Sequence, residues 1–169
     1  DKKRLIELEK WKKEEELKQR KEQRKAEVAR RLSVKYPNGE WIHNSSLDCS
    51  VWSPVLKPNG KFTWSGKCVD GMLSGSGKIQ WLDNGEKRNK YEGEYKEGMA
   101  NGHGVFTWLS GDQYKGEWKD GSMSGYGVYT WSDGERYEGG YKDSEESGHG
   151  IYTHANGDRY EGEFKDGKR

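Results

Sequence analysis

A period of 23 residues limits what this chain of 169 residues can fold into more than any other feature of its sequence. A tyrosine recurs at that spacing, at Tyr91, Tyr114, Tyr137 and Tyr160, and a glycine follows each of them two positions later. Two positions further along stands a second aromatic, at Tyr95, Trp118, Tyr141 and Phe164. Such regular columns indicate tandem copies of one small unit, each of which buries the face of its neighbour.

Each unit is predicted to be a β-hairpin, because its residues alternate with a period of two. In segment 91–95 the two tyrosines and the glycine fall on one face and the two glutamates on the other. We expect the glycine-containing stretch 99–102 to be the turn, and segment 104–108 to be the return strand. A strand glycine lets a ring from a neighbouring strand lie flat over the backbone. The predicted sheet therefore builds its core from its own rings.

The composition favours a thin sheet over a thick aliphatic core. Hydrophobic residues make up only 30% of the chain and charged residues 35%, averages that are typical of disordered chains. The 8 Trp, 10 Tyr and 3 Phe argue against disorder, because disordered chains are poor in aromatics. We expect no membrane span and no signal peptide in the sequence as given, since it holds no apolar run of the necessary length.

Three regions are predicted: a charged helix over residues 1–36, a cap over 37–63, and the repeat array over 64–169, with four units and the opening of a fifth. Residues 1–32 hold 13 Lys/Arg and 8 Asp/Glu, a net charge of +5. The rest of the chain holds 17 Lys/Arg and 21 Asp/Glu, a net charge of −4. The helix is expected either to be solvated along its length or to dock through its two apolar ends. An acidic array argues against nucleic acid as a partner.

The motif Tyr-Glu-Gly-Glu-Tyr, followed by Gly-x-Gly-x-Phe/Tyr-x-Trp, resembles the MORN repeat over residues 64–169. The resemblance implies a mainly β fold, an elongated single-layer antiparallel sheet of tandem β-hairpins, here preceded by the long charged N-terminal α-helix. It also implies mostly non-catalytic roles in scaffolding, self-association and sometimes phospholipid contact. The unit that begins at Tyr137 departs from the pattern at Gly140 and Ser144, which puts its turn geometry in question.

The segment Cys49-Ser-Val-Trp-Ser-Pro54, with Trp64-Ser-Gly-Lys-Cys68, is similar to the entry cap of MORN proteins from bacterial cell envelopes. A disulfide between Cys49 and Cys68 would close a loop of roughly 20 residues and stabilise the cap by ~3 kcal/mol. Two reduced thiols are one alternative, and a metal site with His43 is another, although its spacing matches no zinc pattern. The resemblance implies an oxidising location, the bacterial periplasm or the outside of the cell, with the cytoplasm as the alternative.

Catalysis is not expected. His103 and His149 occupy a slot that sister units fill with Ser76 and Tyr126, and His154 replaces a tryptophan in an aromatic column. The many carboxylates alternate with lysines, as on a solvated strand face. The sequence therefore predicts no enzyme, no cofactor and no bound metal.

A contiguous strip of rings is predicted to be the binding surface, because monomeric soluble proteins seldom leave large apolar patches uncovered. Its expected members are Tyr95, Trp108, Trp118, Trp131, Tyr141 and Phe164. The occupant is expected to be a protein partner or a second copy of the chain. The alternatives are a module that touches a membrane surface through the basic helix, and an accessory domain of a larger enzyme.

Overall fold

The computed structural model describes residues 2–34, 36, 37, 39–53 and 61–168. One helix, α1 (Lys2–Ser33), precedes the strands, which form one sheet. The strands are β1 (Glu40–Asn44), β2 (Cys49–Ser53), β3 (Phe62–Trp64), β4 (Lys67–Val69), β5 (Met72–Asp83), β6 (Glu86–Lys96), β7 (Met99–Thr107), β8 (Gln113–Lys119), β9 (Ser122–Thr130), β10 (Arg136–Lys142), β11 (Glu145–Thr153) and β12 (Arg159–Phe164). Residues 54–60, part of the predicted cap, lie outside the described residues.

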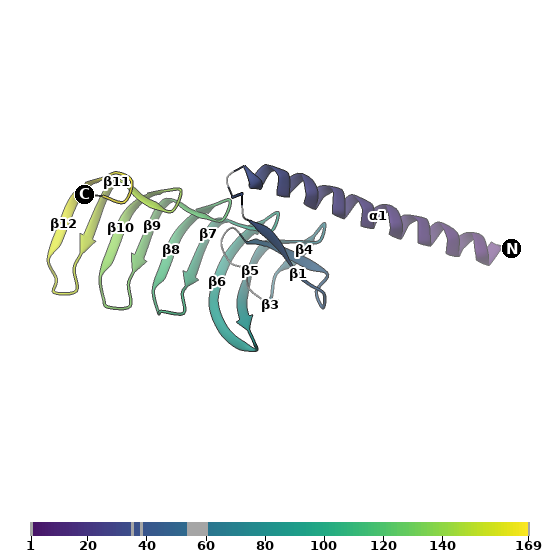
Figure 1. The fold of residues 1–169 in the computed structure, drawn as a ribbon, viewed down its shortest axis with the longest axis horizontal. Helices are drawn as coiled ribbons and strands as arrows, with labels where there is room; N and C mark the ends of the chain where they lie inside the picture. Colours follow the sequence, from purple (N-terminus) through teal and green to yellow (C-terminus); the bar gives the residue numbers. More distant parts are fainter. Residues whose placement is uncertain (1, 35, 38, 54–60, 169) are drawn as a thin grey trace.

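The sheet is open, and the strand order β1-β2-β5-β6-β7-β8-β9-β10-β11-β12 follows the chain, with β3 and β4 both paired to β5. All pairings are antiparallel except the short one between β2 and β5, at Ser50 and Met72. The hairpins follow one another along the molecule, and α1 extends away from the end opposite the C-terminus (Figure 1). The predicted fold class, a single sheet of tandem hairpins after one helix, is confirmed.

The hairpin turns lie two residues upstream of the predicted ones. Residues 99–102 begin strand β7, and the turn is the pair before them, Glu97 and Gly98, with φ of 51° and 76°. Two successive left-handed residues are typical of the type I′ turn, whose twist matches that of the flanking strands. The same pair recurs at Asp120-Gly121, Asp143-Ser144 and Asp166-Gly167. Ser144 adopts a φ of 71°, so the turn keeps its geometry where the glycine is missing.

In the units that begin at Tyr91, Tyr114 and Tyr137, the opening tyrosine lies over two glycines at once. The ring of Tyr114 covers Gly116 on its own strand and Gly127 on the next strand, where a Cβ would lie 2.4 Å from the tyrosine hydroxyl oxygen. A ring over a glycine of a neighbouring strand is what the sequence predicts, and the same ring also covers the glycine of its own strand. Because Gly116 and Gly127 are cross-strand partners, one ring fills the space above both. The ring is fully buried in a sheet without a second layer.

Nine rings, which we call the buried ring row, form a continuous chain of edge-to-face contacts; eight of them are buried and Tyr160, at the end, is half-buried. In contact order they are Trp64, Tyr95, Tyr91, Trp118, Tyr114, Tyr141, Tyr137, Phe164 and Tyr160. Ring centroids along this chain lie 4.8 Å to 5.4 Å apart. Such perpendicular pairs contribute about 0.5–1.5 kcal/mol each beyond the burial of their area. The row therefore couples every hairpin to the next.

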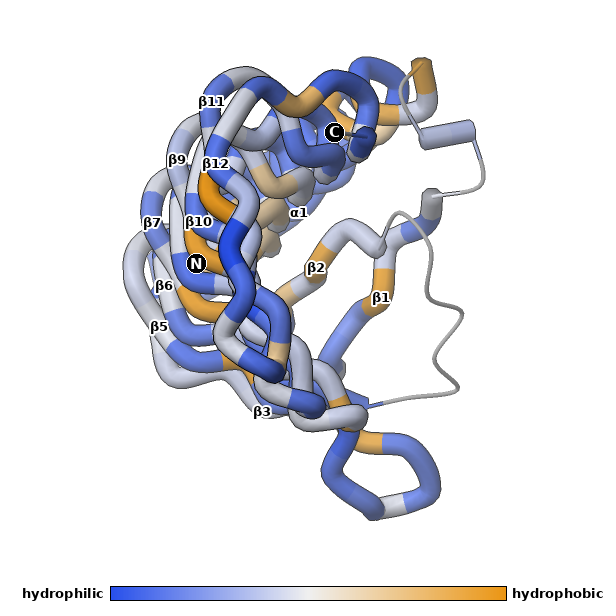
Figure 2. The backbone as a smooth tube through the Cα atoms, turned by 90° about the vertical axis from the view of Figure 1, so that its left-hand side faces the viewer, coloured by the Kyte–Doolittle hydropathy of each residue, from blue (hydrophilic) through white to orange (hydrophobic). Residues whose placement is uncertain are grey.

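The cap strand β2 runs along the edge where the hairpin turns lie. The backbone N–H of Ser50 donates to the carbonyl of Gly71 at 2.8 Å, and that of Trp52 to the carbonyl of Gly98 at 2.9 Å. Viewed along the array, the strands curve into a trough, and β1 and β2 lie opposite its wall (Figure 2). The cap therefore covers one end of the concave face.

Gly116→Val is expected to lower the free energy of unfolding by more than ~2 kcal/mol, the scale of overpacking damage. The added Cβ would lie 2.5 Å from the hydroxyl oxygen of Tyr114 and 2.6 Å from the Cα of Gly127. Thr107→Val on the opposite face is the matched control and should change stability little. Urea denaturation of both variants measures the difference, and equal losses would mean that the faces are wrongly assigned.

Candidate functional site

A second row of rings lines the concave face beside the buried ring row. This half-buried ring row consists of Phe106, Trp108, Tyr129, Trp131, Tyr152 and His154, each in contact with the next. Its centroids lie 4.5 Å to 5.4 Å apart. The return strands β7, β9 and β11 and the residues just after them supply its members. Because each ring of this row is only partly covered, the row is an accessible aromatic surface on the concave face.

A groove of about 380 Å³ opens where this row meets the cap. We call it the interaction groove; Val51, Trp52 and Ser53 of β2 line one side of it. The sheet lines the rest, with residues that include Trp81, Tyr95, Phe106, Trp108, Trp118 and Met123. No charged residue lines it within the described part of the chain. An apolar groove of this size falls within the ~300–1,000 Å³ of typical ligand-binding clefts.

Four of the six predicted site residues belong to the buried ring row. Tyr95 and Trp118 are each 8% exposed, and Tyr141 and Phe164 are covered further still. The indole N–H of Trp118 donates to the carbonyl of Gly104 at 3.2 Å, and its ring meets Tyr91 and Tyr114 edge to face. These four rings hold the hairpins together and are largely covered, although Tyr95 and Trp118 also contribute to the lining of the interaction groove.

Trp108 and Trp131 are the two predicted residues that remain accessible, as half-buried members of the second row. Sequence reasoning omitted Phe106, Tyr129 and Tyr152, their neighbours in that row. The signal was present, since each unit carries its second aromatic pair on the return strand. The sequence could not show how deeply each ring is buried, because both aromatic columns of the repeat lie on the same face of the sheet.

Hydrogen bonds fix the far end of the half-buried ring row. Nδ1 of His154 lies 3.1 Å from Oε1 of Glu135, and the hydroxyl of Tyr152 donates to the other oxygen of that carboxylate. His103 and His149 instead face solvent, with side chains 80% and 61% exposed. Among the described residues, no group of three or more His, Cys, Asp or Glu is placed to hold a metal ion.

The C-terminal third of α1 docks on the first two hairpin turns. Val28 and Leu32 are buried, at 2% and 3% exposure, in a cluster with Trp52, Met72 and Met99. Met72 and Met99 begin the return strands directly after their turns, at positions that later units fill with Ser122 and Glu145. The apolar contact is therefore possible only at the first two turns.

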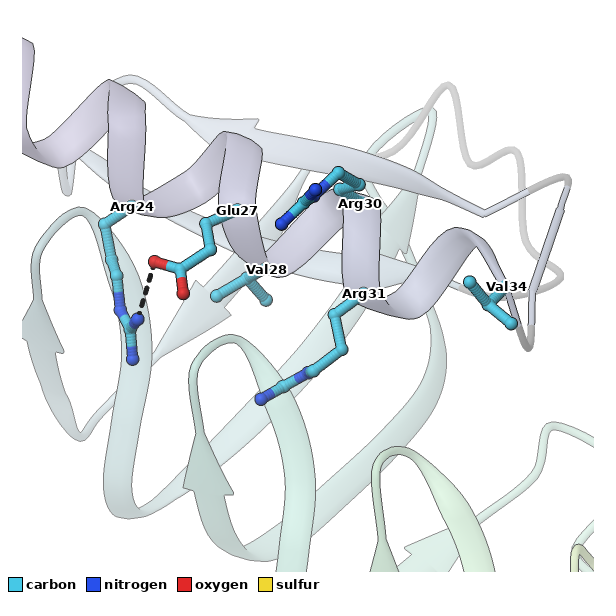
Figure 3. Close-up of a pocket in the computed structure, with 6 residues that line it drawn as sticks. All are labelled: Arg24, Glu27, Val28, Arg30, Arg31 and Val34. Carbon is cyan, nitrogen blue, oxygen red and sulfur yellow. Dashed lines mark hydrogen bonds and ion pairs between the residues drawn. The ribbon is translucent and has the colours of Figure 1, made fainter.

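Ion pairs surround this apolar contact. Basic residues of α1 reach acidic residues of the turns and the cap: Arg20 reaches Asp70, Lys21 reaches Asp48, and Arg24 and Arg31 both reach Glu97. The Glu97 side chain is only 14% exposed, although its residue lies in a turn. Figure 3 shows the arginines grouped around Val28, with Arg24 also bonded to Glu27 at 2.8 Å.

The other end of α1 extends away from the array (Figure 1). Leu5, Ile6, Leu8 and Trp11 are 60%, 58%, 47% and 59% exposed, and α1 leads them away from the sheet (Figure 1). Of the two apolar ends of the helix, the C-terminal one therefore docks on the array, and contact of the N-terminal one with a partner stays a prediction. No helix of the described residues is long and apolar enough to cross a membrane.

The two cysteines join the cap to the first hairpin. Cys49 in β2 and Cys68 in β4 are placed in a disulfide, with Cα atoms 5.9 Å apart and a sequence separation of 19. Cys49 is fully buried in the same cluster as the rings. His43, the third residue of the alternative metal site, lies beside Ser50, with its Nδ1 3.1 Å from the serine hydroxyl.

These features define a class of protein, a tandem β-hairpin repeat whose open sheet carries a concave aromatic face. The family model described as MORN repeat matches residues 65–86, 91–113, 114–136, 137–159 and 160–169, so the chain belongs to the MORN repeat family. No curated protein matches the chain. MORN repeats generally serve as protein- or membrane-interaction modules.

Stability is expected to fall above pH ~10, because burial raises the pKa of the core tyrosines, that of Tyr137 to about 12. Burial likewise raises the pKa of Tyr95 and Tyr141. The folded state favours the neutral phenol, so this contribution is complete below the unfolded pKa of ~10 and is lost as the pH rises toward the folded values. Urea unfolding at about pH 9 and about pH 11 measures the loss of stability. The phenolate absorbance of the folded protein reports the titration of its tyrosines. Normal titration of all tyrosines in the folded state would contradict the assignment.

Proposed function

We propose that the protein is a non-enzymatic interaction scaffold that receives a protein segment in the interaction groove. One observation carries the proposal: the groove is apolar, lies open between the cap and the sheet, and continues into the half-buried ring row. Trp and Tyr dominate binding hot spots, since they bury much area at little cost in rotamer entropy. Surfaces of this kind seldom stay uncovered on soluble proteins.

The proposed absence of catalysis is supported by the state of the polar groups on the concave face. The hydroxyl of Tyr114 donates to the backbone carbonyl of Glu117 at 3.0 Å, and Glu135 holds Tyr152 and His154. These groups are engaged in fixing rings. A nucleophile would need an adjacent base oriented toward it.

Trp108→Ser combined with Trp131→Ser should weaken capture of the native partner at least thirtyfold, the loss expected for hot-spot residues of about 2 kcal/mol. Trp118 is unsuitable for this test, because its removal would open the buried ring row. The measurement is a pull-down from the native source with mass spectrometry, followed by a titration of the recovered partner. Leu109→Ser, which removes an exposed apolar side chain outside the groove lining, is the control. Undiminished capture by a folded double variant would exclude the groove.

We further propose an oxidising location, the bacterial periplasm or the outside of the cell. The support is the placement of Cys49 and Cys68 in a disulfide that ties the irregular cap to the sheet. Such bonds persist in oxidising compartments and are rare in the cytosol.

Freshly isolated protein should contain no titratable thiol under denaturing, non-reducing conditions. After reduction, two thiols should appear, and the cap should become less stable by ~3 kcal/mol, the chain-entropy value for a loop of this size. Thiol titration and urea unfolding before and after reduction are the measurements. Two free thiols in the fresh protein would rule out the oxidising location.

A further inference from the structure

The half-buried ring row carries two indole N–H donors. The indole N–H groups of the buried tryptophans Trp64 and Trp118 donate to backbone carbonyls of the chain, at 3.0 Å and 3.2 Å. Those of Trp108 and Trp131, at the same position of two successive units, have no acceptor within the part of the chain that the structure describes. Each of these two units therefore presents a half-buried ring together with one free N–H donor.

The spacing of the two donors restricts the ligand that can use both. Each unit contributes two strands at ~4.8 Å per strand, so equivalent rings of successive units lie ~9.6 Å apart. The centroid of Tyr129 lies 5.1 Å from that of Trp108 and 4.5 Å from that of Trp131, which holds the two tryptophans within that distance. A polyproline II helix repeats every three residues, or ~9.3 Å, and keeps register with this spacing. An α-helix repeats one face every seven residues, ~10.5 Å, and a β-strand every two residues, ~6.8 Å.

Backbone hydrogen bonding favours the same ligand. The carbonyls of an α-helix are bound within the helix, whereas a polyproline II helix has no internal hydrogen bonds and leaves its carbonyls free. A carbonyl of one turn can therefore accept from the indole N–H of Trp108, and a carbonyl of the next turn from that of Trp131. Proline rings between these carbonyls pack on aromatic side chains, and the fixed φ of proline lowers the entropy lost on binding.

Carboxylates lie beside the rings of this row. Oδ1 of Asp112 accepts from the backbone N–H of Ser132 at 2.8 Å, and burial together with the charge of Asp112 raises the pKa of Tyr129. Among the described residues, no lysine or arginine forms an ion pair with Asp112. Glu135 holds the equivalent position of the next unit, with Oε1 3.1 Å from Nδ1 of His154. The border of the row is therefore acidic, and it favours a ligand with Lys or Arg side chains.

We propose that the half-buried ring row binds a proline-rich segment with Lys or Arg side chains, in the polyproline II conformation, with one turn of the segment on each unit. The inference rests on the proposed function and names the chemistry of the partner. The rings contact the prolines, and the indole N–H groups of Trp108 and Trp131 donate to backbone carbonyls of the segment. The carboxylates of Asp112 and Glu135 attract its cations. Because the row opens into the interaction groove at the cap, one end of the segment lies in that groove.

A synthetic peptide with the tripeptide Pro-Pro-Lys repeated four times tests the proposal, in a titration of the full chain up to about 1 mM peptide. Two-dimensional NMR of the indole N–H groups is the readout. The signals of Trp108 and Trp131 should shift, whereas that of Trp118 should not, because its N–H donates to Gly104. A peptide of Ala-Ala-Lys repeats has the same charge but favours a helix, and should bind at least tenfold more weakly. A peptide of Pro-Pro-Glu repeats should also bind at least tenfold more weakly, because its charge is repelled.

Trp108→Phe and Trp131→Phe each keep an aromatic ring and remove one donor. Each should weaken binding of the Pro-Pro-Lys peptide roughly fivefold, the effect of one hydrogen bond. Trp11→Phe makes the same change on the exposed part of α1 and should bind like wild type. The indole shifts of the wild-type protein, assigned through the backbone, answer the same question if a variant does not fold.

Asp112→Asn tests the charge and should weaken binding about two- to fivefold, the range of a surface ion pair. The chain already holds an asparagine at the equivalent position of the preceding unit, where Asn89 accepts from the backbone N–H of Leu109 at 2.9 Å. The substitution therefore keeps the hydrogen bond to Ser132 and removes only the charge. Asp166→Asn removes a charge in a hairpin turn at the opposite edge of the sheet and should bind like wild type.

Three results would overturn the proposal. They are no binding of the Pro-Pro-Lys peptide at the highest concentration, equal binding of the Ala-Ala-Lys peptide, and undiminished affinity of folded Trp108→Phe and Trp131→Phe. None of them decides the proposed function, which the titration of the native partner with the double serine variant tests separately. A native partner that needs both tryptophans, although the Pro-Pro-Lys peptide does not bind, would leave the groove as a protein-binding site for a segment of another conformation.

Discussion

The contact between a tyrosine ring and the backbone of two paired glycines is the interaction on which the rest of the structure depends. Without side chains at Gly104 or Gly127, a ring can lie flat on its own sheet, where a Cβ would come within 2.2 Å to 2.4 Å of its hydroxyl oxygen. The sheet thereby obtains a core without a second layer, which a chain with only 30% hydrophobic residues could not otherwise build. The cap uses the same device, since Trp41 lies over Gly98 and Trp64 over Gly77.

This use of the tyrosines determines which rings are left for binding. Each buried tyrosine packs edge to face against a second aromatic ring on its own strand, as Tyr114 does against Trp118, with ring centroids 5.1 Å apart. That second ring is therefore part of the core. The rings of the return strands pack only against each other and against the edge of the buried row, so they remain half exposed. One face therefore serves both stability and recognition, in two parallel rows.

The periodic columns predicted the hairpins, the shared ring face and the family, because strand alternation and glycine spacing are local properties. They did not predict how deeply each ring is buried, which depends on contacts between successive hairpins. The turn was misplaced because Gly102 was taken as its signal, although Glu97-Gly98 is the pair with the φ values of a type I′ turn. The sequence did contain signals for the docking of α1. Only the first two units place a methionine after the turn, and only the second has a glutamate, Glu97, where later units have aspartate.

The longer side chain at position 97 explains how the helix is held in one orientation. An aspartate in that turn would be one methylene shorter, whereas Glu97 reaches two arginines a full two turns of helix apart, Arg24 and Arg31. Partly exposed ion pairs add little net stability, so the burial of Val28 and Leu32 supplies most of the attachment energy. The ion pairs instead restrict rotation of the helix about its axis. Because α1 is one continuous helix anchored near its C-terminal end, that restriction also sets the direction in which its exposed apolar end points.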